Sequence, residues 1–208
     1  ASRDKLLTVI ATLACLRPSE VCALQICDLL FDFHVAAGFL EFTGSVLIRV
    51  IKRKNDAARK GHFPALGKAH DPSLDVVQQL KSFLGQSHLA VHAQCTKPAC
   101  PHARCPVCPP VFSRCVTVAG HVRPSLRPLS PQMVGEAIQT AVAAVGFNPS
   151  HFSAVSARKG GISTAISAGV PEEIIFLQSG PGQARAARTY MHLQHPSRLY
   201  DTFRAFSL

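Results

Sequence analysis

Four residues far apart in the sequence have side chains that together could cut a phosphodiester bond. They are Arg17, Lys54, Arg158 and Tyr190. Arginine side chains bind two non-bridging phosphate oxygens and stabilise the charge of a pentacoordinate transition state. A tyrosine hydroxyl can attack the phosphorus and hold the strand covalently, while a lysine can protonate the leaving 5′ oxygen. Such a set needs no metal ion, because the cations supply the positive charge.

Each of these residues also has an ordinary structural interpretation. Arg17 lies at a break between two helical patterns, where it could cap a helix or form an ion pair with Glu20. Lys54 could be a solvated strand end, and Arg158 could belong to a solvated helix face. Tyr190 could be an amphipathic residue that is half in the core. No one of these residues decides the question alone.

The apolar pattern predicts helices on both sides of a small sheet, so the fold class is mainly α with a small antiparallel β-sheet (α+β). One helix is expected after Ser2 and a second from Pro18 to about Asp28. Short runs rich in β-branched and aromatic residues predict the sheet over about residues 38–66, with a basic turn between its second and third strands. A helix follows from about Asp71. Further helices are expected at about 131–146, 153–168, 171–178, 184–194 and 196–206, with Gly146, Gly169 and Gly180 as stops.

The stretch from about residue 87 to residue 128 is rich in proline and cysteine and has little periodicity. We interpret it as a loop-rich insertion. Four thiolates within it could hold a structural zinc ion, which would order a segment with few apolar residues. Packing of the sequence VCPPVF on the body of the protein is the alternative. The candidate zinc ligands are Cys95, Cys100, Cys105 and Cys108.

Segments of this chain, taken in order, resemble the catalytic domain of the tyrosine recombinase (phage integrase) family. ATLACLRPSEVCALQICDL resembles the first-arginine segment of that family, and IKRKNDAARKGHFPAL resembles its β-hairpin lysine segment. SARKGGISTAISAGVPEEIIFLQSG resembles the second-arginine segment, and YMHL resembles the usual ending. The matches span Leu6 to Leu193. The insertion and the RKGG form are most similar to the eukaryotic, transposon-borne branch.

The resemblance implies a role for each candidate residue. Arg17 and Arg158 would clamp the scissile phosphate. Lys54 would be the general acid, and Tyr190 would be the nucleophile that forms a 3′-phosphotyrosine bond; Tyr200 is a rival whose spacing fits less well. Double-stranded DNA would be the partner, with self-association on DNA, and no cofactor would be required. Supporting roles for the helix of the first arginine would fall to Glu20 and Asp28.

Two positions depart from the family's pattern. The family commonly has a histidine three residues before the second arginine, where this chain has Val155. It commonly has histidine, and sometimes tryptophan or lysine, after the glycine of the following segment, where this chain has Pro181. Because a positioned proton carrier typically contributes about 10²–10⁴-fold in rate, losing both could leave a DNA-binding module with weakened or no chemistry. A zinc-ordered interaction domain is the third hypothesis.

Composition is compatible with a DNA partner. The formal net charge is +10, which favours binding to a polyanion. No apolar run approaches the about 20 residues of a bilayer span, and no secretory signal is recognised, so we expect an intracellular location with DNA, in the nucleus if the source is eukaryotic. We further expect residues 1–208 to form one catalytic domain that lacks an N-terminal DNA-clamping domain. Reduced thiols are then expected, with Cys15, Cys22 and Cys27 as small core residues.

This charge predicts salt-sensitive DNA binding. Phosphate contacts release counterions, so affinity for a duplex should fall steeply between about 50 and about 200 mM salt in a fluorescence-anisotropy titration. Binding that does not change with salt would remove the nucleic-acid interpretation. The basic surface is expected to include Lys52, Arg53, Lys54, Arg59, Lys60, Arg158, Lys159, Arg185 and Arg188.

Overall fold

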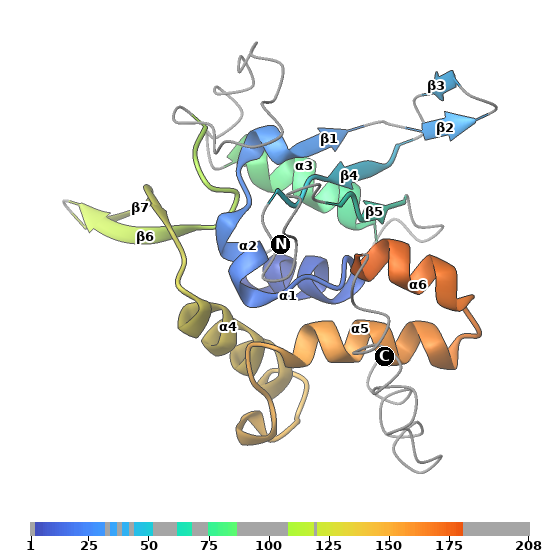
Figure 1. Cartoon of the computed structure of the whole chain (residues 1–208). Helices are drawn as coiled ribbons and strands as arrows, with labels where there is room; N and C mark the ends of the chain where they lie inside the picture. Colours follow the sequence, from blue (N-terminus) through green and yellow to red (C-terminus); the bar gives the residue numbers. More distant parts are fainter. Residues whose placement is uncertain are drawn as a thin grey trace.

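The computed structural model describes residues 3–31, 34–36, 39–41, 44–51, 62–67, 75–86, 108–118 and 120–180. This part of the chain is mainly helical with small antiparallel sheets (Figure 1). No helix within it is long and apolar enough to cross a membrane. The helices are α1 (Arg3–Leu13), α2 (Pro18–Ala23), α3 (Val76–Gln86), α4 (Pro131–Ala143), α5 (Ser156–Ser167) and α6 (Glu172–Ser179), with 3-10 turns at Ile26–Asp28 and Pro149–His151. The strands are β1 (Leu29–Phe31), β2 (His34–Ala36), β3 (Phe39–Glu41), β4 (Val46–Ile48), β5 (Ala65–Leu66), β6 (Ser113–Val118) and β7 (His121–Pro128).

Helix α1 is the central element of the fold. It contacts α2, α3, α4 and α5, and Figure 1 shows it in the middle of the molecule. Its apolar residues recur at helical spacing, so Leu6, Leu7 and Ile10 are all buried. Because α1 has neighbours on several sides, small shifts of this helix would be transmitted to most of the other elements.

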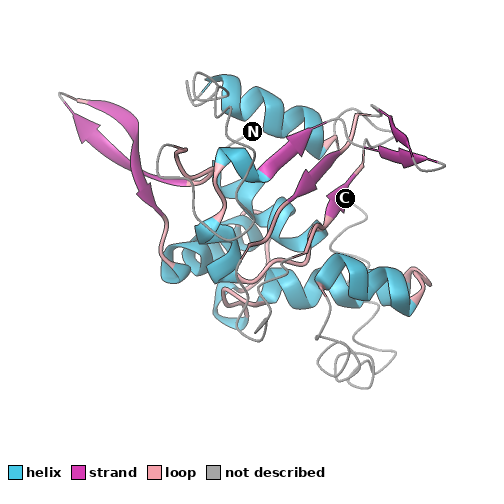
Figure 2. Ribbon diagram, turned by 45° about the horizontal axis from the view of Figure 1, so that its top comes forward, coloured by secondary structure: helices cyan, strands magenta, loops and turns pink. Residues whose placement is uncertain are grey.

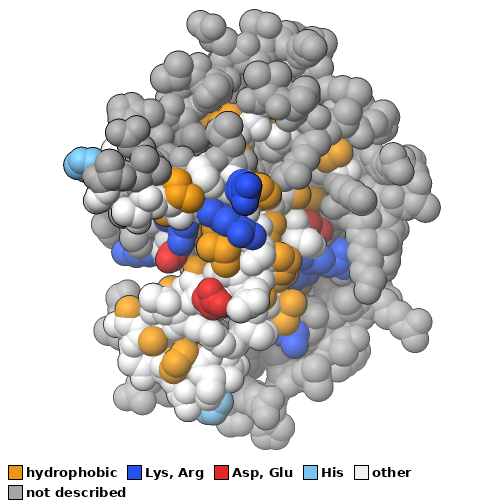
Figure 3. All heavy atoms as spheres, turned by 90° about the vertical axis from the view of Figure 1, so that its left-hand side faces the viewer, with side chains coloured by type: hydrophobic (Ala, Val, Ile, Leu, Met, Phe, Trp, Pro, Cys, Tyr) orange, Lys and Arg blue, Asp and Glu red, His pale blue; other side chains and the backbone are white. Residues whose placement is uncertain are grey.

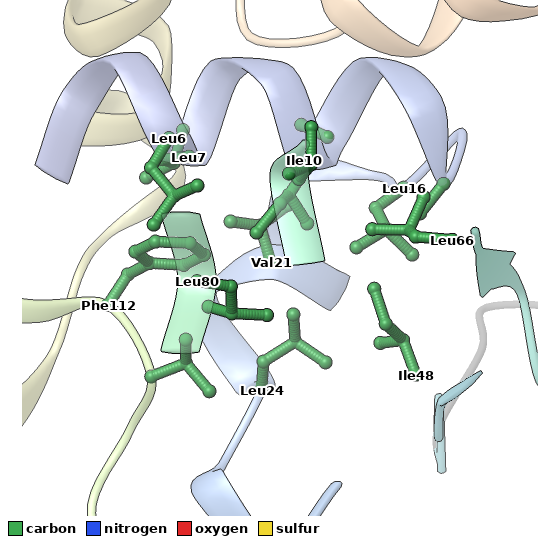
Figure 4. Packing of buried hydrophobic residues seen from close by; sticks show 14 of the residues in the cluster. Leu6, Leu7, Ile10, Leu16, Val21, Leu24, Ile48, Leu66, Leu80 and Phe112 are labelled. Carbon is green, nitrogen blue, oxygen red and sulfur yellow. The ribbon is translucent and has the colours of Figure 1, made fainter. Parts of the chain in front are cut away.

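The hydrophobic core lies between α1, α2, α3 and the sheet (Figure 4). Burying one such aliphatic or aromatic side chain contributes about 1.5–3 kcal/mol. Phe112 is buried in the same cluster, and its ring centroid lies 6.0 Å from that of Phe83 on α3. The end of the Cys/Pro-rich segment is therefore part of the core. The labelled side chains that point toward one another are Leu6, Leu7, Ile10, Leu16, Val21, Leu24, Ile48, Leu66, Leu80 and Phe112.

The main sheet has three strands in the order β1-β4-β5, all antiparallel. The register pairs Leu29 with Ile48 and Val46 with Leu66. An isolated bridge between Val50 and His62 continues the β4–β5 pairing beyond the two named strands. The predicted basic turn thus connects two paired segments, and the turn itself lies outside the described residues. The sheet starts earlier than predicted, because β1 begins at Leu29.

The predicted second helix is too long. It was expected to reach Asp28, but α2 ends at Ala23 and Leu24 is already extended. The chain after α2 pairs instead with a distant segment: Val111 N donates to the Leu24 carbonyl at 2.9 Å, and Ile26 N donates to the Pro109 carbonyl at 3.1 Å. This pairing uses the backbone groups that a longer helix would have needed.

The prediction of a loop-rich insertion over residues 87–128 is wrong for its last part. Residues 113–128 form a two-stranded antiparallel ribbon, β6–β7, with a register shift between Ser113 and Cys115. β-Branched residues favour the strands, and the prolines at 124 and 128 concealed the pattern because proline is rare inside sheets. Residues 87–107 lie outside the described residues.

Other helix boundaries agree more closely with expectation. Gly146, Gly169 and Gly180 all have positive φ and follow α4, α5 and α6, which confirms them as helix stops. Helix α3 begins at Val76, five residues later than predicted, and the Asp75 carboxylate accepts a hydrogen bond from Gln78 N at 2.9 Å. The helices expected at 184–194 and 196–206 lie outside the described residues.

Adjacent glycines of α5 give a matched test of this packing. A Cβ at Gly161 would overlap the Thr12 carbonyl oxygen of α1, whereas a Cβ at Gly160 would meet nothing within 4 Å. We expect Gly161→Ala to lower the free energy of unfolding by about 1–3 kcal/mol, because α1 and α5 must separate. Gly160→Ala should raise it by about 0.5–1 kcal/mol, since alanine favours the helix. Urea denaturation measures both, and equal effects would contradict the close approach of α1 and α5.

Candidate functional site

The Glu20 carboxylate lies between the guanidinium groups of Arg17 and Arg158. Its Oε1 is 3.8 Å from Arg17 Nη1, and its Oε2 is 3.8 Å from Arg158 Nη1. Only 3% of Glu20 is exposed. Arg17 precedes α2, Glu20 lies within α2, and Arg158 lies in the first turn of α5. The fold therefore brings two arginines from distant parts of the sequence to one buried carboxylate.

Local sequence fixes the position of Arg17. Pro18 occupies the first turn of α2, where its missing N–H costs no helical hydrogen bond. Arg17 is extended, with φ −76° and ψ 154°, and its backbone N donates to Glu20 Oε2 at 2.8 Å. Glu20 thereby caps the helix and faces both arginines. The ion pair with Glu20, which was the structural interpretation of Arg17, is present.

Arg158 is held from both sides by backbone carbonyls. Its Nη1 donates to the Cys15 carbonyl, and its Nη2 donates to the Ser179 carbonyl at 3.2 Å. Arg158 is 5% exposed, so its interpretation as part of a solvated helix face, and its inclusion in an exposed basic surface, are both wrong. The guanidinium ties the end of α1 to the end of α6.

Cys15 shapes the turn that presents this carbonyl. It has φ 49°, a left-handed conformation that is uncommon for residues other than glycine. Burial raises the pKa of its thiol to about 11, although the nearby Arg158 acts in the opposite direction. The thiol is thus neutral near pH 7, which disfavours a role as nucleophile or metal ligand. Cys15 is buried as predicted, whereas Cys22 and Cys27 are half-buried.

Arg17 retains an unused donor within the site. Its Nη1 is buried and has no hydrogen-bond partner in the described part of the chain, and the nearest carboxylate oxygen is the one 3.8 Å away. Its side chain is 22% exposed, whereas that of Arg158 is 6% exposed. Two guanidinium groups against one carboxylate leave a net positive charge, and anions are the ligands that match such a site.

Gln178 connects the sheet to this site and was not identified from the sequence. Its Oε1 accepts from Ala65 N at 3.0 Å, and its Nε2 donates to the Ala65 carbonyl at 2.8 Å and to the Leu13 carbonyl at 3.0 Å. The amide therefore joins β5 and the end of α1 to α6. Ser179, whose carbonyl accepts from Arg158, is the next residue. No local pattern distinguishes this glutamine from a surface one.

A buried ion pair fixes the start of the sheet. Asp28 Oδ1 accepts from Arg49 Nε at 3.0 Å and from Arg49 Nη2 at 2.8 Å, while Asp28 Oδ2 accepts from Gln25 N at 2.9 Å. Asp28 therefore supports the junction between α2 and β4. Arg49 was not identified from the sequence, because its partner Asp28 lies 21 residues away and no local pattern links the two.

Several predicted site residues lie outside the described residues. Of the zinc candidates only Cys108 is described; it is buried, and its carbonyl accepts from Gln25 Nε2 at 2.7 Å. Within the described ranges no three His, Cys, Asp or Glu residues cluster as a metal site. Lys159 is exposed on α5. The residues left outside are Lys52, Arg53, Lys54, Arg59, Lys60, Cys95, Cys100, Cys105, Pro181, Arg185, Arg188 and Tyr190.

Val155 occupies the N-cap of α5 and offers no side-chain hydrogen bond there. It is 42% exposed, three residues before Arg158.

Neither a family model nor a curated protein matches this sequence. The function must therefore follow from the chemistry of the arginine pair and its surroundings.

The Glu20 carboxylate should be essential for stability. Glu20→Gln keeps an oxygen that can accept from Arg17 N but removes the charge that faces Arg158. We expect the free energy of unfolding to fall by about 3 kcal/mol, which is the lower end of the cost of breaking a buried ion pair. The cost is at the lower end because two carbonyls still accept hydrogen bonds from Arg158. Glu136→Gln, at an exposed glutamate of α4, is the control and should leave the urea midpoint nearly unchanged. Equal midpoints for the two variants would contradict this role.

Proposed function

We propose that this chain is a DNA-binding tyrosine-type recombinase catalytic domain, which cuts and rejoins DNA through a 3′-phosphotyrosine intermediate. The observation that carries the proposal is the meeting of Arg17 and Arg158 on one buried carboxylate, at 3.8 Å each. Paired arginines suit a phosphodiester, since each guanidinium can bind two non-bridging oxygens. The resemblance of the segments around them supports the same conclusion.

In this proposal Glu20 keeps the arginines in place before substrate arrives. A buried pair of guanidinium groups would repel each other, and one carboxylate between them lowers that repulsion. The Cys15 and Ser179 carbonyls fix the orientation of Arg158 in advance. Donors that are already oriented stabilise the charge that develops at phosphorus without reorganising during the reaction. Arg17, whose side chain is more exposed than that of Arg158, would contact the phosphate first.

Lys54 and Tyr190 would complete the chemistry. The β4–β5 pairing extends to the Val50–His62 bridge, and Lys54 lies between these two residues in the sequence. Lys54 would supply the proton for the leaving 5′ oxygen. Helix α6 ends at Gly180, and Tyr190 follows ten residues later. Gln178 holds the end of α6 against β5 and the end of α1. It therefore links the helix that precedes Tyr190 in sequence to the strand that follows Lys54.

One observation favours a second candidate, a DNA-binding module with weakened chemistry. Val155 places an apolar side chain at the N-cap of α5, three residues before Arg158. A donor at this position could stabilise charge on the phosphate, and valine has none. With this donor and the one at Pro181 both missing, binding could persist while strand cleavage is slow.

Trapping on a nicked suicide substrate separates these candidates. The wild-type chain should form a covalent DNA adduct that is visible on a denaturing gel. Tyr190→Phe should form none while its duplex affinity stays nearly unchanged, because one hydroxyl adds little to an interface dominated by phosphate contacts. Tyr200→Phe is the matched control and should still form the adduct.

The remaining outcomes are equally decisive. Adduct formation by Tyr190→Phe would overturn the assignment of the nucleophile. Duplex binding without any wild-type adduct would favour the weakened module. Absence of duplex binding would overturn the proposed function altogether.

A further inference from the structure

The β6–β7 ribbon projects from the body of the protein beside α2 and α4 (Figures 1 and 2). Its base is anchored in the core: Phe112 and Leu129 are both buried, and Leu129 N donates to the Phe112 carbonyl at 3.4 Å. Further out the strands are exposed, including Val116 at 43%. Arg17 and Arg158 lie on other elements, so the ribbon is not part of the arginine site.

The sequence around the ribbon contains basic side chains but no acidic ones. Between Asp75 and Glu136 the sequence contains no aspartate or glutamate. Two arginines of the ribbon, Arg114 and Arg127, are exposed. No carboxylate among the described residues forms an ion pair with either of them. Over the same interval the basic residues are Lys81, Lys97, Arg104, Arg114, Arg123 and Arg127.

Three arginines lie near the backbone at the base of the ribbon, beside the register shift between Ser113 and Cys115. Ser113 pairs with Pro128, Arg114 Nε donates to the Pro128 carbonyl at 3.1 Å, and Arg127 is the neighbour of that proline. Arg3 of α1 donates to the Ser113 carbonyl at 3.2 Å, but its charge is balanced by Asp4, whose Oδ1 lies 2.7 Å from Arg3 Nε. Figure 3, which faces this side of the molecule, shows Lys and Arg side chains gathered near the middle of the face, with Asp or Glu side chains beside them.

We propose that the β6–β7 ribbon is a second contact with duplex DNA, in which Arg114 and Arg127 bind backbone phosphates away from the scissile one. The proposal rests on the proposed function, since it assumes a DNA substrate. A two-stranded ribbon matches the width of the major groove, which is about 12 Å. Arginine forks bind phosphates, and an exposed apolar side chain such as that of Val116 can contact thymine methyl groups. An acidic protein surface would use the charges but not the shape of the ribbon.

The salt dependence of duplex binding tests the ribbon contact. The slope of log affinity against log salt is negative, and each lost phosphate contact lowers its magnitude by about 0.9. We expect Arg127→Gln to lower it by about that amount and the Arg114→Gln, Arg127→Gln double variant by about twice as much. Lys81→Gln on α3 removes an equal charge outside the ribbon and should leave the slope unchanged. Arg114→Lys keeps the charge and should bind DNA more tightly than Arg114→Gln.

The outcomes separate the ribbon from the arginine site. Duplex binding by the wild type with the same slope for the ribbon variants and Lys81→Gln would overturn the ribbon contact and leave the proposed function intact. Absence of wild-type duplex binding would overturn both. A loss larger for single-stranded RNA of equal length than for duplex would also overturn the proposal, because the ribbon would then serve another partner. Unfolding midpoints near that of the wild type show that the variants are folded.

Discussion

A buried carboxylate is the constraint on which this structure depends. Burying Glu20 without partners would cost several kcal/mol, so the fold must deliver cations to it. Arg17 comes from the turn after α1, and Arg158 comes from α5. Because each arginine lies on a different element, the position of α2 relative to α5 is fixed by one charge. The same charge distribution leaves excess positive potential for an incoming anion.

The contacts around this cluster explain why α1 and α5 approach so closely. Arg158 reaches the Cys15 carbonyl only if its helix lies against the end of α1. Gly161, one turn further along, permits that approach because it has no Cβ to meet Thr12. The left-handed backbone of Cys15 then turns its carbonyl toward Arg158. The packing of α5 against α1 and the orientation of Arg158 therefore depend on the same contacts.

Sequence reasoning located the elements whose signals are local. The glycine stops after α4, α5 and α6 and the antiparallel β4–β5 pair depend on neighbouring residues, and they could be predicted. The end of α2 could not, because it is set by pairing with Pro109 and Val111 far along the chain. Gln178 and Arg49 were missed for the same reason, since their partners are distant in sequence. The ribbon was missed because prolines obscured its alternation.

The contrast between the two basic regions suggests how binding and chemistry are divided in the proposed function. Arg158 is buried and already bonded to two carbonyls, so it contributes little to the long-range field that attracts DNA. The exposed arginines of the ribbon face solvent and are suited to counterion release. In the proposed function, the exposed charges would therefore set the affinity for DNA, while the arginine pair, which has no side-chain donor at Val155 beside it in sequence, would set the rate of cleavage. A protein built this way would retain DNA binding long after losing its chemistry, since the two depend on different residues.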